Sequence, residues 1–112
     1  MPYPSSDHPL LPLLSELESV LRQHQLWEQA TPAAWQLDSD VPFAADTLTF
    51  PAWLQFIFLP RMRDLLQTGT AVPAMQLVPA AEVFLPRQTP HAAADIISVL
   101  SDVDSLAKQD GV

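Results

Sequence analysis

Several groups of side chains in this sequence are of types that can do chemistry, beginning with its histidines and closely spaced carboxylates. The histidines His8, His24 and His91 lie far apart, and none has the i, i+4 partner that a metal site on a helix needs. Asp38 and Asp40 resemble the opening of a calcium-binding loop. The glycine and glutamate that such a loop needs at its sixth and twelfth positions are missing. We therefore expect no metal site.

A second pair of aspartates, Asp102 and Asp104, is also separated by one residue, but within a predicted helix. Residues two apart on a helix point in different directions, so the two carboxylates cannot act as a catalytic pair. The chain has 2 glycines and no cysteine, which excludes glycine-rich phosphate loops and thiol catalysis. It also lacks a G-x-S-x-G motif. These features predict a protein that is not an enzyme and binds no cofactor.

The strongest candidates for a binding role surround an aromatic segment, residues 50–61. Asp46 precedes this segment and Arg61 ends it, with phenylalanine and tryptophan residues between them. In one interpretation Asp46 helps to cap a helix, Arg61 pairs with a carboxylate and the aromatic rings form the core. In the other, part of the group is an exposed docking surface, because interfaces are rich in Trp, Phe and Arg. The candidate binding residues are Phe43, Asp46, Trp53, Phe56 and Arg61.

Hydropathy patterning places these residues in an all-α protein, since no segment alternates with a period of two for long enough to form a strand. Apolar residues recur at helical spacing from Leu10 to Leu21 and from Ile96 to Ala107. We predict a bundle of four or five helices with proline-rich connections and no internal repeat. The predicted organisation is a flexible arm (1–9), a single helical domain (10–108) and a tail (109–112).

Capping signals predict where these helices begin and end. The first helix should start near Pro12 and end around Gln25. The last helix should be capped by Thr89 with Pro90 in its first turn. Between them, short helices are expected at 32–35, capped by Thr31, and at 78–84. The remainder of residues 28–49 should be an ordered loop that covers Trp35, Leu37, Val41 and Phe43.

The central helix has the clearest signals of all. Thr49 is a suitable cap, and Leu48 and Trp53 have the spacing of a hydrophobic staple. Gly69 is a natural stop residue. Pro60 removes a backbone hydrogen bond in the middle of the helix, so we expect a kink or a break there.

Charge and hydropathy limit the partners and the compartment. The 112 residues include 13 acidic and 5 basic ones, a net charge of −8, which argues against a surface that neutralises the phosphates of a nucleic acid. The longest apolar stretch, Phe50–Pro60, is shorter than the roughly 20 residues that a transmembrane helix needs. The N-terminal segment lacks the basic region of a signal peptide. We expect a soluble cytoplasmic protein that does not contact membrane or nucleic acid directly.

Read in order, the segment DTLTFPAWLQFIFLPRMRDLL resembles the YqcC-like family of small bacterial proteins. The most specific matches are Pro42-Phe43, Asp46-Thr47, Trp53-Leu54-Gln55 and Leu59-Pro60-Arg61-Met62, and the similarity extends from about Leu10 to Leu106. The resemblance implies an all-helical fold without an established activity. It also implies a link to a tRNA pseudouridine synthase, beside which family members are often encoded. It supplies no catalytic residues.

Two hypotheses follow for the function. The first is an interaction module whose partner is another protein, such as a tRNA-modifying enzyme, that it either assists or inhibits. The second is a small-molecule binder or minor enzyme. Its pocket would be lined by Phe43, Trp53, Phe56 and Met62 and oriented by Asp46 and Arg61. The sequence leaves self-association through the aromatic helix open.

Overall fold

The computed structural model describes residues 9–70 and 76–110, and it confirms the all-α class, with no strand in these ranges. The predicted arm, apart from Pro9, lies outside the described residues, and residues 109 and 110 of the predicted tail continue the last helix. The helical elements are α1 (Leu10–Gln23), α2 (Ala34–Leu37), η2 (Pro42–Ala44), α3 (Phe50–Trp53), η3 (Leu54–Phe58), α4 (Leu59–Thr68), α5 (Leu77–Gln88) and α6 (Ala93–Asp110).

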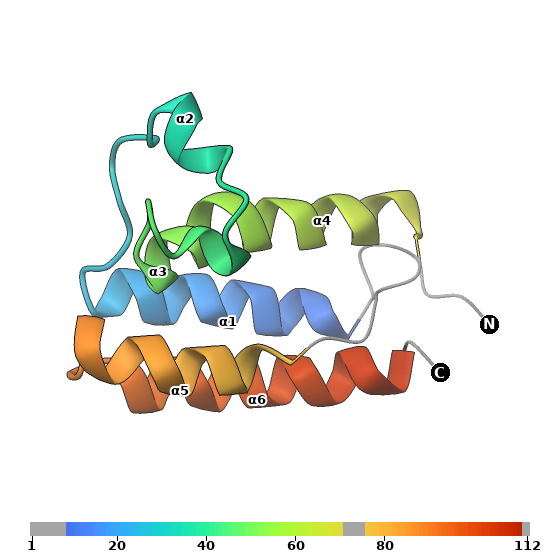
Figure 1. Cartoon of the computed structure of the whole chain (residues 1–112). Coiled ribbons are helices and arrows are strands. Elements are labelled where there is room, and N and C mark those ends of the chain that lie inside the picture. Colours follow the sequence, from blue (N-terminus) through green and yellow to red (C-terminus); the bar gives the residue numbers. More distant parts are fainter. Residues whose placement is uncertain (1–8, 71–75, 111–112) are drawn as a thin grey trace.

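The long helices form a bundle around α1. Helix α1 packs against α6 and also against α4, while α5 packs against α6 and α3 (Figure 1). The short helix α2 projects from this bundle above α3 (Figure 1). The first turn of α1 and the last turn of α6 lie at the same end of the molecule (Figure 1). None of the helices within the described ranges is long and apolar enough to cross a membrane.

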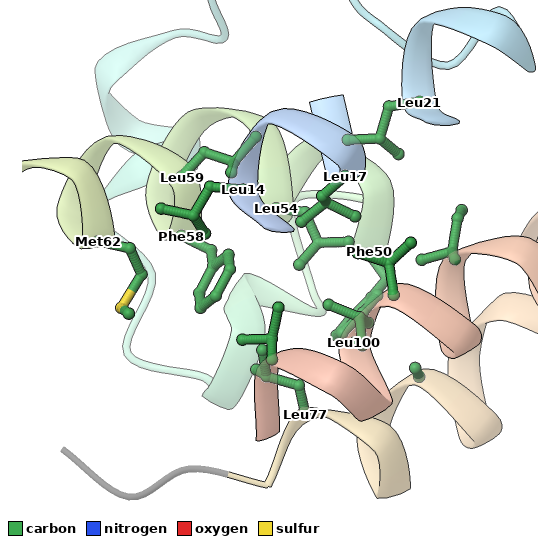
Figure 2. Close-up of a cluster of buried hydrophobic side chains, with 14 of the residues drawn as sticks. Leu14, Leu17, Leu21, Phe50, Leu54, Phe58, Leu59, Met62, Leu77 and Leu100 are labelled. Atoms are coloured by element: carbon green, nitrogen blue, oxygen red, sulfur yellow. The ribbon is translucent and has the colours of Figure 1, made fainter. Parts of the chain in front are cut away.

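The core is built from one face of each long helix, as the hydropathy pattern predicts. On α1, leucines at i, i+4, i+7 and i+11 are fully buried, from Leu10 to Leu21. They meet Phe50, Leu54 and Phe58 of the central helix and Leu100 of α6 (Figure 2). This contact of three helices fixes which face of the central helix is buried.

Of the kink or the break expected at Pro60, the break does not occur, because helical structure continues through this residue. Thr49 caps its start by accepting a hydrogen bond from the amide of Ala52, at 3.2 Å, and Gly69 ends it in the left-handed conformation with φ 72°. Between α3 and α4, η3 is a π-helix, in which the amide of Leu59 donates to the carbonyl of Leu54. Pro60 has no amide to donate one turn back, and the wider π turn accommodates this loss without interrupting the helix.

Side chains from distant elements hold other backbone groups in place. Gln88 at the end of α5 accepts a hydrogen bond from the amide of Phe50 at 2.8 Å, at the start of α3. The buried amide of Gln55 bonds both the N–H and the carbonyl of Glu28, at 2.8 and 3.0 Å. Asp104 on α6 accepts from the first amides of α5, at 2.8 to 3.0 Å. Asp104 thus caps the start of α5.

Two predicted caps are wrong. The short helix α2 begins at Ala34, not at Pro32, and the side chain of Gln36 accepts from the amide of Ala33 where Thr31 was expected to act. Helix α6 begins at Ala93, three residues later than a cap at Thr89 would require.

Candidate interaction surface

The aromatic residues predicted to bind a partner belong mainly to the core. Phe43 and Trp53 are half-buried and meet edge to face, with ring centroids 5.0 Å apart. Phe43 also contacts Phe50 and Phe84, at 5.7 and 6.4 Å, and Trp53 stacks on Phe50 and Phe58. This arrangement favours the core interpretation for most of the aromatic run. Phe43 is different, because it also lines an open groove.

Phe43 reaches this position through an unusual backbone. Phe43 and Ala44 both have positive φ, 59° and 49°. Non-glycine residues rarely adopt this left-handed region, and a bulky residue there is strained. The reversal of the chain buries the Ala44 methyl group against Leu48 and Ala52 and directs Phe43 toward Phe84 of α5. The segment 41–45 is thereby held beside α5.

An apolar groove of about 550 Å³ lies between segment 41–45 and α5. We call it the 41–84 groove. It is lined by Val41, Pro42, Phe43, Ala45, Gln76, Pro79, Ala80, Val83 and Phe84. Val41 and Val83 are 42% and 56% exposed, although the sequence had suggested that Val41 would be covered. Sequence reasoning missed this groove because its two walls are far apart along the chain.

Several charged residues are close in sequence to residues that line the 41–84 groove, but none of them lines it. Asp40 and Asp46 flank the segment 41–45 and are exposed. On α5 the charged residues are Glu82, beside Val83, and Arg87, one turn beyond it. The residues close to the lining residues in sequence thus carry three carboxylates, those of Asp40, Asp46 and Glu82, and one guanidinium, that of Arg87.

The structure does not bring Asp46 and Arg61 together. The Asp46 carboxylate accepts a hydrogen bond from the hydroxyl of Ser39, and Thr49 is the cap of the central helix. Arg61 is exposed on α4, about 16 Å along the helix axis from Phe50 at 1.5 Å per residue. Phe56 packs in a separate small cluster with Leu48 and Ala52, on another face.

The described cavities therefore give no pocket of the composition predicted for a small molecule. Besides the 41–84 groove, a second cavity of about 580 Å³ lies among residues 25–30, Thr49, Pro51, Gln88 and Thr89. A third, of about 350 Å³, includes Phe56. None of the three is lined by Trp53, Asp46 or Arg61. Within the described ranges, no three His, Asp or Glu side chains are grouped so as to hold a metal ion.

One ion-pair network connects α1 with α4. Glu18 accepts hydrogen bonds from Arg63 at 2.8 Å and from Arg22 at 3.0 Å. The bond from Arg63 is the main reason that the pKa of Glu18 lies below its usual value of 4.5; partial burial opposes this shift and the bond from Arg22 adds to it. Arg63, and not Arg61, is thus the arginine of α4 that pairs with a carboxylate here. Arg22 also lies over the ring of Trp27, at 4.5 Å.

Comparison with known proteins gives consistent results along most of the chain. The model of a family described as tRNA pseudouridine synthase C (DUF446) matches residues 10–106. The chain is 37% identical over 98 residues to the uncharacterized protein YqcC of Escherichia coli K12, covering 87% of this chain and 89% of that one. The solution NMR structure of E. coli YqcC matches with a TM-score of 0.78 and 35% identity, covering 90% of this chain and 86% of that one.

Two further relatives match over shorter stretches. An uncharacterized protein of Haemophilus influenzae is 42% identical over 60 residues, 54% of this chain and 57% of that protein. A protein of Pectobacterium carotovorum named tRNA pseudouridine synthase C is 38% identical over 60 residues, which are 54% of this chain but 16% of that protein.

Proposed function

Because the chain belongs to the YqcC-like family, we propose that it is an accessory protein that binds a tRNA pseudouridine synthase and carries out no chemistry of its own. Its place of action would then be the cytoplasm, together with that enzyme. A small helical bundle with an open apolar groove suits this role.

The observation that carries the proposal is the relationship to the Pectobacterium protein. That protein is named tRNA pseudouridine synthase C, and the segment similar to this chain is a small part of it. A segment that lies within a longer chain in one protein, and makes up most of another protein such as E. coli YqcC, often interacts with the rest of the longer chain. We infer the same contact for the bundle described here.

The charge of the chain supports contact with the enzyme over contact with its RNA. At −8 the protein is attracted to the basic surface that an RNA-modifying enzyme presents to its substrate. Phosphates would repel it. Binding over the RNA-binding surface of the enzyme would inhibit pseudouridine formation, whereas binding elsewhere on the enzyme would allow this protein to assist it. An activity measurement distinguishes the two.

The test is to mix the purified chain with the tRNA pseudouridine synthase C of the same bacterium and to measure the complex by sedimentation velocity and calorimetry. We expect a complex with a Kd of about 10 µM or tighter, equivalent to roughly 7 kcal/mol. A pseudouridine synthase of different specificity is the control. If no complex forms at about ten times that concentration, the proposal is wrong. Pseudouridine formation in tRNA, with and without the chain, then distinguishes assistance from inhibition.

A further inference from the structure

Of the three cavities described above, the 41–84 groove has the most apolar lining, and no interaction described so far occupies it. We propose that it is the docking site for an amphipathic helix of the partner protein, apolar on one face and flanked by lysine or arginine. This inference rests on the proposed function and adds the surface and the chemistry of the segment that occupies it.

The shape and lining of the groove favour a helix as the occupant. One wall of the groove is formed by a face of α5 together with the residue that precedes this helix. The lining residues of this wall follow the i, i+3, i+4, i+7 spacing of a helical stripe: residues 76, 79, 80, 83 and 84. A second helix laid along such a stripe packs its own apolar residues between these side chains. The volume of about 550 Å³ offers room for several side chains.

The exposure of apolar side chains is concentrated at this groove. Among the described residues, the large apolar side chains that are exposed are Trp35, Val41 and Val83, and the last two line the groove. They stand on opposite walls, one on segment 41–45 and the other on α5. A helix seated between them would remove both from water, at a gain of about 25 cal/mol for each Å² of apolar surface.

Charge identifies the partner as basic and argues against a second copy of this chain. Asp40 and Asp46 are exposed and flank the lining segment 41–45 in sequence, and no charged residue lines the groove itself. On α5, Arg87 continues the helical stripe that lines the groove and Glu82 lies off it, so the acidic side of the groove is segment 41–45. Lysine or arginine on the rim of the incoming helix would pair with these carboxylates and accelerate association. Two copies joined through the same groove would bring their carboxylates together, and each copy carries a net charge of −8.

The backbone of segment 41–45 prepares the groove before any partner arrives. Phe43 and Ala44 are held in the left-handed region by burial of Ala44 and by the contacts of Phe43 with Trp53 and Phe84. Strain of this kind is often found where a surface is shaped for binding. A wall that is already in position loses little entropy when a helix docks.

The apolar contact is tested with Val83→Glu against Val83→Ala, using the synthase as the binding partner and calorimetry as the readout. Both variants should fold, which circular dichroism checks, because the side chain is 56% exposed. We expect Val83→Glu to weaken binding at least about tenfold and Val83→Ala only a few-fold. Trp35→Glu places the same charge at an exposed apolar residue outside the groove, and should change the Kd less than about twofold.

The charge complementarity is tested with Asp40→Lys against Asp102→Lys, which makes the same change in net charge on the exposed surface of α6. Asp40→Lys should weaken binding several-fold more than Asp102→Lys and flatten its dependence on salt. If both variants have equal effects, the groove is not where the basic segment docks.

The possible failures can be told apart. Absence of any complex with the wild-type protein overturns the proposed function, and the docking site with it. If the wild-type protein forms the complex and the Val83→Glu variant binds the synthase equally tightly, the docking site is wrong but the proposed function stands.

Discussion

Thr89 has a buried side-chain hydroxyl, 6% exposed as a residue, for which no hydrogen-bond partner exists among the described residues. A buried polar group without a partner has lost its contacts with water and gained nothing in return. The neighbouring backbone shows the cause. The amide of Ala92 donates to the carbonyl of Thr89, and α6 begins only at Ala93, so no amide of the first turn reaches the hydroxyl.

Replacing Thr89 with valine should therefore stabilise the protein. Valine has nearly the same shape but no hydroxyl, so the variant removes the cost of burying that group. The free energy of unfolding should rise by about 1 kcal/mol in urea titrations followed by tryptophan fluorescence. Thr89→Ala is the control, because it also removes a buried methyl group and should not be stabilising. A less stable Thr89→Val protein would mean that the hydroxyl does have a partner.

Two threonines that were both predicted to cap helices, Thr49 and Thr89, show what can be predicted from sequence for a single residue. Thr49 and Thr89 carry similar signals, each with a proline one or two residues later. Only Thr49 caps a helix, bonding the amide of Ala52. The difference depends on where the next helix is placed by its packing on the rest of the bundle, which the local sequence does not encode.

Between elements, α1 and α4 are connected by the pair of Glu18 with Arg63, and this connection should depend on pH. The pKa of Glu18 in the folded protein lies below 4.5, so near that pH the unfolded chain binds more protons than the folded one. The stabilisation by Glu18 is therefore complete above pH 4.5 and is lost as the pH falls through the lower folded value.

Glu18→Gln should thus destabilise the protein at neutral pH and make little difference in acid. Because the side chains of Arg63 and Arg22 are 41% and 54% exposed, water screens the ion pairs, and we expect a loss of about 0.5 kcal/mol at neutral pH. Urea titrations of both proteins at neutral pH and near pH 3 measure this difference. The matched control is Glu16→Gln. A difference that stays constant with pH would contradict the assignment.

The positions of the helices could be predicted from the sequence better than the groove that forms between segment 41–45 and α5. The apolar stripes of α1 and α6, the cap at Thr49 and the stop at Gly69 are local patterns, and the structure confirms them. The 41–84 groove instead joins residues about forty positions apart. The wall formed by segment 41–45 also depends on Phe43 having a left-handed backbone conformation, which a phenylalanine in a sequence does not indicate. The π segment before Pro60, which lets the helix continue without a break, was not predicted because a π turn is rare and has no reliable sequence signature.

For the molecule as a whole, the charge of −8 leads to a prediction about RNA. The protein alone should not shift tRNA in a gel at about 0.15 M salt, because it has few cations to displace the counterions of the phosphates. The synthase alone provides the positive control. Binding of tRNA by the free chain that weakens as salt increases would show that a basic surface has been overlooked.

The first turn of α1 and the last turn of α6 lie at the same end of the bundle, and this has a consequence for how strongly such a bundle must bind (Figure 1). A bundle of this kind can be joined to an enzyme through either terminus without passing a linker around the molecule. Such a tether gives an effective local concentration in the millimolar range, so a weak contact is enough to keep the two parts associated. A bundle that binds the same enzyme as a separate polypeptide has no such help. It would need a tighter contact than a covalently joined relative to stay associated at the same concentration.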